Sequence, residues 1–260
     1  MLQPPVRLED MKAPTHAEWD QIGRVVDDHL LETVSSLTPE EWLKPTDCDP
    51  WRVRDIVAHI VAWDHATINP GRFTRESVLG FRARKGHGGN RLDAQNQLQV
   101  DGLASVAPTE LLARLRSLTP RFHKAKRRLA GLGRAIPYKE NFSGTWVTFG
   151  YALTTILGRD HFMHHIDICK ATGRTFEPNP EEVKIVHDAV REWAGKADAD
   201  VRLELTGPAG GTFIRGPGTT TIAADAIEFC RVISGRHCDD LKIVGDEPSA
   251  QRWLAQRAVF

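Results

Sequence analysis

Apolar residues repeat with helical spacing over the first two thirds of the chain. They recur every three or four residues in four stretches, over roughly 16–36, 51–68, 108–130 and 145–172, as expected for helices that each bury one face. The segments TPEEW at 38–42 and LDAQNQLQ at 92–99 are typical of shorter helices. The pattern therefore predicts a bundle of four main helices.

The pattern changes after residue 172. GRTFEPNPEE at 173–182 contains a glycine and two prolines, which end the long helix and lead into another at 181–197. VRLELTG, GGTFIRG and TTTIAAD then alternate as strands do, AIEFCRVISG favours a helix, LKIVGD a strand and SAQRWLAQRAVF a terminal helix. We expect an α+β protein, with a helical bundle over 1–175 and a small α+β domain over 176–260.

Composition excludes several classes of partner. Lys plus Arg and Asp plus Glu number 34 each in 260 residues, so no overall field attracts nucleic acid or an anionic membrane. Charges interrupt every apolar stretch, which predicts that none spans a bilayer. The four cysteines form no CxxC pair and no signal segment is visible, so we expect a cytoplasmic protein. The sequence does not indicate an oligomeric state.

The stretch RDHFMHHIDI carries the clearest candidate chemistry. At 100° per residue, a helix places Asp160, His164 and Asp167 on its apolar face. A carboxylate and an imidazole in a core are costly unless they are paired or bind a metal. His161 and His165 are expected to point towards the flank, where they form a second, more solvent-exposed HxxxH pair.

A third candidate ligand lies in WRVRDIVAHIVAWD. His59 stands there at the edge of an apolar stripe, so two helices can bring it to Asp160 and His164. Two histidines and a carboxylate leave a fourth position open, as in catalytic zinc sites, and Asp167 is placed to accept the other ring N–H of His164. The simpler alternatives are a hydrogen-bonded core histidine and a local contact between Asp160 and His164.

Three segments, in the same order, resemble the mycothiol-dependent maleylpyruvate isomerase family: TDCDPWRVRDIVAHIVAWD, RDHFMHHIDICKATGR and IAADAIEFCRVISGR. The similarity spans nearly the whole chain. It implies a DinB-like four-helix bundle that holds a divalent metal, usually zinc, through His59, Asp160 and His164, followed by a sterol-carrier-like α+β domain. The characterised isomerase often has glutamate where this chain has the shorter Asp160.

The resemblance also implies a function. Its small-thiol cofactor is mycothiol, so we expect a metal-dependent enzyme that uses a small thiol in isomerisation of, or transfer to, an electrophilic small molecule. Arg236, at the end of a predicted helix, is the candidate for orienting a negative group of the substrate, with Arg231 and Arg215 as competitors; a charge that only favours a helix C-terminus is the alternative. A zinc-dependent amide hydrolase and a non-catalytic small-molecule carrier remain open.

Overall fold

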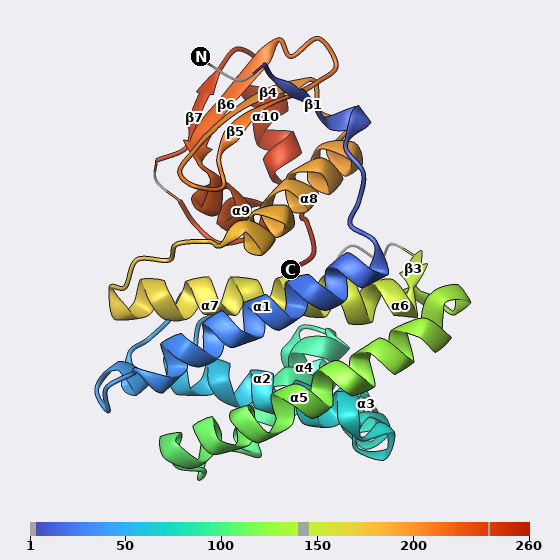
Figure 1. Cartoon of the computed structure of the whole chain (residues 1–260), viewed down its shortest axis with the longest axis vertical. Coiled ribbons are helices and arrows are strands. Elements are labelled where there is room, and N and C mark those ends of the chain that lie inside the picture. Colours follow the sequence, from blue (N-terminus) through green and yellow to red (C-terminus); the bar gives the residue numbers. More distant parts are fainter. Residues whose placement is uncertain (1–3, 140–145, 239) are drawn as a thin grey trace. The chain divides into compact units, whose positions relative to one another are not determined.

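The structure is a computed structural model that describes residues 4–139, 146–238 and 240–260. It divides into two compact units (Figure 1): one extends from Gly23 to Phe176, and the other joins Glu177–Phe260 to the N-terminal residues up to Ile22. The first unit is mainly helical and the second combines a five-stranded sheet with helices. The predicted α+β class, with an N-terminal helical region, is therefore confirmed.

Long amphipathic helices build the helical unit, and α2 packs against α3, α4, α5 and α7. Its elements are α1 (His16–Ser35), which enters the unit at Gly23, and then η2 (Glu41–Leu43), α2 (Val53–Ile68), α3 (Pro70–Ala83), η3 (Arg84–His87), α4 (Arg91–Asp101), α5 (Pro108–Leu132), η4 (Gly133–Ala135), β2 (Pro137–Lys139), β3 (Trp146–Thr148), α6 (Phe149–Tyr151), the π-helical η5 (Ala152–Ile156) and α7 (Leu157–Thr172).

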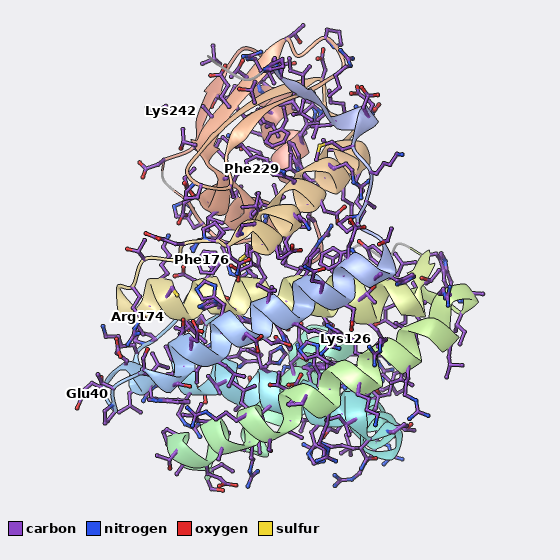
Figure 2. All side chains as sticks on the ribbon, viewed as in Figure 1. Glu40, Lys126, Arg174, Phe176, Phe229 and Lys242 are labelled. Atoms are coloured by element: carbon purple, nitrogen blue, oxygen red, sulfur yellow. The ribbon has the colours of Figure 1, made fainter. Side chains whose placement is uncertain are left out.

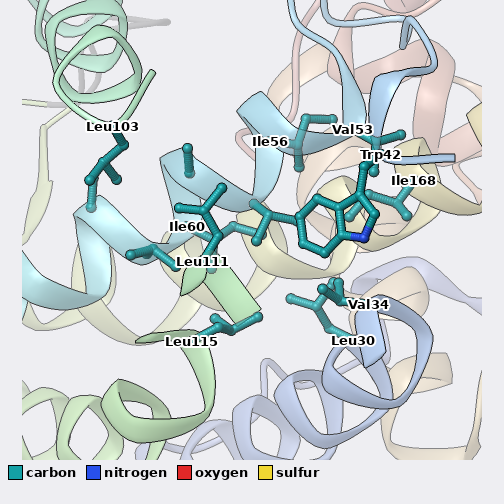
Figure 3. Close-up of a cluster of buried hydrophobic side chains, with 14 of the residues drawn as sticks. Leu30, Val34, Trp42, Val53, Ile56, Ile60, Leu103, Leu111, Leu115 and Ile168 are labelled. Atoms are coloured by element: carbon teal, nitrogen blue, oxygen red, sulfur yellow. The ribbon is translucent and has the colours of Figure 1, made fainter. Parts of the chain in front are cut away.

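One apolar cluster joins α1, η2, α2, α5 and α7 (Figure 3). Trp42 from η2 is 5% exposed and lies among aliphatic side chains that include Leu30, Ile56, Leu111 and Ile168. Each side chain of this size stabilises the fold by about 1.5–3 kcal/mol when it leaves water. The cluster therefore fixes α2 against α7, the two helices that carry the candidate ligands.

Three features of this unit differ from the sequence prediction. α3 is a separate helix that we did not expect, because its sequence PGRFTRESVLGFRA has few apolar residues and buries only Gly80 fully. The antiparallel pair of β2 and β3 was also missed, since each strand has three residues. The helix expected over 145–172 includes this second strand and is interrupted by the π-helical turn at Ala152–Ile156; residues 140–145 lie outside the described residues.

The second unit contains a mixed sheet in the order β1-β5-β4-β6-β7. Its strands are β1 (Val6–Arg7), β4 (Val201–Thr206), β5 (Gly211–Arg215), β6 (Thr220–Asp225) and β7 (Lys242–Val244), and its helices are η1 (Leu8–Asp10), α8 (Pro180–Ala197), α9 (Ala226–Ser234) and α10 (Glu247–Leu254). Alternate residues of β4 and β6 are buried, which is typical of a sheet with helices on one face. Trp193 of α8 fills this core, in edge-to-face contact with Phe229 of α9.

The N-terminal strand adds a feature that the sequence did not indicate. β1 pairs in parallel with β5, with Val6 opposite Phe213, and Leu8 is buried just after it. The N-terminal residues thus group with the C-terminal unit. The domain boundary expected from the sequence, between residues 175 and 176, placed them with the bundle; that boundary stays a prediction. In the described part of the chain, no helix has the length and apolar character needed to cross a membrane.

Candidate metal centre

Helices α2 and α7 position the three predicted ligands. At the start of α2 the backbone N–H of Arg52 donates to the Asp55 carboxylate at 3.0 Å. α7 follows the π-helical turn, a feature often found at functional sites. His59 lies on α2, and Asp160 and His164 lie one turn apart on α7.

The structure brings these three side chains together. His59 Nε2 lies 3.6 Å from Asp160 Oδ2, and His164 Nε2 lies 3.5 Å from Asp160 Oδ1. One donor atom from each residue lies within 4.8 Å of the others. The two imidazole side chains are buried, whereas the Asp160 side chain is 21% exposed. The cluster is therefore accessible on its carboxylate side.

The donor atoms are arranged as a metal would require. Distances of 3.5 and 3.6 Å are too long for good hydrogen bonds, but they are close to the about 3.3 Å that separates ligands with tetrahedral zinc bonds of about 2.0–2.1 Å. Among the described residues, Asp160 Oδ2 and His59 Nδ1 are buried without a hydrogen-bond partner. A buried carboxylate oxygen is costly in that state, and a cation between the three groups would remove the cost for Asp160.

Charge within the cluster is shared unevenly. Burial raises the pKa of Asp160, but the neighbouring His164 and His59 outweigh it and hold that pKa below its usual range. Burial lowers the pKa of His164, yet the charge of Asp160 and the hydrogen bond with Asp167 raise it to about 10. Burial dominates at His59, whose pKa is lowered. The cluster thus keeps an ionised carboxylate and one neutral imidazole ready to bind a cation.

Further side chains orient the two histidines. His164 Nδ1 lies 3.1 Å from Asp167 Oδ2, the contact expected from the sequence, which directs Nε2 towards Asp160. The Trp51 ring lies 4.9 Å from the His59 ring, and its indole N–H donates to Gln97 Oε1 of α4 at 3.1 Å. The sequence analysis missed Trp51, although it follows the TDCDP segment directly.

His161 and His165 lie elsewhere than predicted. We expected both to point towards the flank and to be more exposed, but they are 2% and 0% exposed. The flank of α7 is covered by α1: His161 Nδ1 lies 2.7 Å from Asp27 Oδ1, and His165 Nε2 lies 2.8 Å from Thr33 Oγ1. The expectation was wrong because helical spacing shows which residues share a face but not how many faces are covered.

The contact of His161 with Asp27 belongs to a larger buried polar network. His123 Nε2 lies 3.0 Å from Asp27 Oδ2, and His161 Nε2 lies 3.7 Å from Asp64 Oδ1. Lys126 of α5, labelled in Figure 2, is buried beside them. Its ammonium group lies against the backbone of α1 at Gly23, in space that a larger residue at this position would fill. These groups come from α1, α2, α5 and α7, so they tie the four helices together around the candidate metal centre.

Arg236 belongs to the other unit. It follows α9, and its Nη1 donates to Ser234 Oγ at 2.9 Å. Of its competitors, Arg231 is buried beside Glu228, and Arg215 contacts Asp198 at 2.6 Å. All three arginines therefore have contacts within their own unit, and the catalytic assignment of Arg236 stays a prediction.

Comparison with known proteins identifies the family. The family model described as "Mycothiol maleylpyruvate isomerase N-terminal domain" matches residues 24–169, which is more than half of the chain and includes all three candidate ligands. The chain belongs to the mycothiol maleylpyruvate isomerase family.

Solved structures agree with this family assignment. The crystal structure of the mycothiol-dependent maleylpyruvate isomerase matches 92% of this chain and 98% of its own, with a TM-score of 0.61 and 17% identity. A histidine-to-alanine mutant of that isomerase matches equally well, with 16% identity. At these identities the maleylpyruvate isomerase structures establish a shared fold. No curated protein matches by sequence.

Proposed function

We propose that the chain is a metal-dependent enzyme that uses a small thiol, mycothiol first, in isomerisation of, or transfer to, an electrophilic small molecule. The observation that carries this proposal is the convergence of two imidazoles and one carboxylate on a common point, within the segment that matches the family. The names of the family and of the matching isomerase support mycothiol as the thiol.

His59, Asp160 and His164 are the proposed ligands of the metal, with zinc as the first candidate. When bound, the metal would supply a Lewis acid that lowers the pKa of a thiol. Asp160 contributes the negative charge of the ligand set, and Asp167 holds His164 through its other ring nitrogen. Asp160 keeps part of its side chain exposed, which leaves an approach for small molecules.

Trp51 and Arg236 have proposed roles in binding. The Trp51 ring packs against His59, and its N–H is already engaged by Gln97, so the indole limits the space beside the ligands without offering them a competing donor. Arg236 is proposed to bind a negative group of the substrate, because a guanidinium matches a carboxylate with two parallel hydrogen bonds.

The direct test compares three proteins: the wild type, His59→Ala and the control His65→Ala, which changes a histidine of the same helix that contacts Arg72 at 3.0 Å. Metal content and calorimetry with mycothiol are measured on each. We expect about one divalent ion per chain in the wild type and the control, and loss of both metal and thiol binding in His59→Ala.

Three other results would contradict the proposal. Equal mycothiol binding by the wild type and by metal-free His59→Ala would remove the metal from thiol binding. Metal binding without mycothiol binding would favour the amide hydrolase, which uses the same three ligands. Absence of both would favour the small-molecule carrier.

A further inference from the structure

A second group of metal-binding side chains lies on the other edge of His164. Cys48, His164 and Asp167 each offer one donor atom, and these atoms lie within 4.8 Å of one another. The Cys48 thiol donates to Asp167 Oδ2 at 3.2 Å, and His164 Nδ1 lies 3.1 Å from the same oxygen. The proposed metal centre uses Nε2 of His164, so the two groups share one imidazole through opposite nitrogens.

The backbone holds Cys48 in place. The N–H of Trp51 donates to the Cys48 carbonyl at 2.8 Å, and the N–H of Cys48 donates to Thr46 Oγ1 at 3.2 Å. Pro45 and Arg52 close the base of this loop with a β-bridge. The thiol therefore faces Asp167 from a loop fixed at both ends, while its partial exposure gives a cation access.

The geometry suits a thiophilic cation. Donor separations of 3.1 and 3.2 Å are a few tenths of an ångström shorter than the about 3.3–3.6 Å expected around tetrahedral zinc with bonds of about 2.0–2.3 Å. Small side-chain rotations would open the group to that size. A thiolate, an imidazole and a carboxylate are all zinc ligands, and the thiolate favours soft ions such as Cd²⁺.

We propose that Cys48, Asp167 and Nδ1 of His164 form a second cation site, for a thiophilic divalent ion such as Zn²⁺ or Cd²⁺, beyond the site of the proposed function. Binding there releases the thiol proton of Cys48 to solvent. When Nε2 of His164 already binds the first metal, Nδ1 must also release its proton to solvent, because a neutral imidazole offers only one lone pair. The second site is therefore weaker than the first. Its occupation also removes the contact through which Asp167 orients His164, so excess metal inhibits the enzyme.

Cadmium titration tests the second site, because a cadmium–thiolate bond absorbs in the ultraviolet. Cd²⁺ alone is added to the full chain, without added thiol, and both absorbance and bound ions are measured. We expect about two ions per chain in the wild type and about one in Cys48→Ser, with the absorbance lost in that variant. Cys238→Ser changes a cysteine of the other unit and should behave as the wild type.

A further variant separates this proposal from the proposed function. His59→Ala removes a ligand of the first site only, so it should lose one ion and keep the thiolate absorbance. Asp167→Asn preserves the shape of the side chain and should weaken the thiolate-linked binding about tenfold or more, which provides a test if Cys48→Ser does not fold. Absorbance that persists in Cys48→Ser, or is absent from the wild type, would overturn the second site whatever the first site does.

Discussion

Asp64 is a buried carboxyl group for which burial outweighs the stabilising positive charges of His161 and Lys126. It is 1% exposed, and His161 Nε2 lies 3.7 Å from its Oδ1. Burial raises the pKa of Asp64 to about 8, and the nearby negative charge of Asp27 acts in the same direction. At neutral pH the folded protein therefore holds Asp64 protonated, whereas the unfolded chain ionises it near the ordinary pKa of an aspartate, 3.8.

This difference predicts a pH dependence of stability. Between the two pKa values the folded state binds one proton more than the unfolded state, so the free energy of unfolding falls as pH rises from about 4 to about 8. We expect the wild type to lose on the order of a few kcal/mol between about pH 5 and about pH 9. Asp64→Asn should lose clearly less, as measured by urea unfolding.

The matched control for Asp64 is Asp28→Asn, which changes an exposed aspartate of α1. It should follow the wild-type pH profile. If Asp64→Asn and the wild type lost stability in parallel, the raised pKa of Asp64 would not be the cause.

Residue by residue, the sequence was informative where polar groups interrupt an apolar face. His59, Asp160 and His164 were selected on that ground, and the structure places them together. The same reasoning failed for His161 and for Asp27, which lies on the first predicted helix. A polar residue on a helix flank is normally solvated, and only the packing of a third or fourth helix shows that it is buried.

At the scale of elements, α3 and α4 depend on one close approach. A Cβ added to Gly80 would lie 2.7 Å from Gln95 Cβ and 2.9 Å from the Arg91 carbonyl oxygen. α4 carries Gln97, which holds the indole of Trp51, and Asn96, which accepts from the indole of Trp63 at 2.9 Å. The spacing between α3 and α4 therefore bears on the side chains beside the candidate ligands.

Gly80→Ala tests this close contact. The added methyl group meets backbone atoms that cannot rotate away, so we expect it to lower the free energy of unfolding by about 1–3 kcal/mol. Gly86→Ala is the control, because nothing lies within 4 Å of a Cβ at that position. The midpoints of thermal unfolding of the two variants are compared. Equal midpoints would show that α3 and α4 can move apart without loss of stability.

The π-helical turn marks the limit of prediction from periodicity. Its five residues, Ala152–Ile156, are as apolar as those of a buried α-helix, so the sequence does not reveal the turn. A π-helical turn adds one residue, which rotates the helix faces before it by about 100° relative to those after it. The ligands lie after the turn, so their relative placement on α7 was predicted correctly. Positions before it, such as Phe149, could not be assigned to a face in the same way.

At the scale of the whole molecule, the C-terminal unit depends on a short N-terminal segment. Leu8 is 3% exposed, and η1 packs against α8 and β5. Glu9 accepts a hydrogen bond from the backbone N–H of Gly216 at 2.8 Å. These contacts, together with β1, protect the edge of β5 that would otherwise expose its backbone groups.

Leu8→Ala should weaken this edge. Loss of a buried leucine side chain costs about 2–5 kcal/mol, and we expect faster amide hydrogen exchange in β5 than in the helices of the other unit. Leu43→Ala changes a leucine that is 54% exposed and should leave the exchange of β5 unchanged. Unaltered exchange in Leu8→Ala would show that η1 does not hold the edge.

Fold prediction succeeded for long, strongly periodic elements and failed for short ones. The strands over 201–225 were found because three alternating segments follow one another around glycine turns. β1 has two residues and no pattern to detect. Its partner lies near the other end of the chain, so no local signal connects them.

The pairing of β1 with β5 also sets an order of events during synthesis. Val6 is synthesised before its partner Phe213, which follows roughly 200 residues later, after the whole helical unit. β1 must therefore wait until the helical unit has been made before it can pair with β5. The helical unit can fold while the chain is still growing, whereas the sheet needs strands from both sides of that unit.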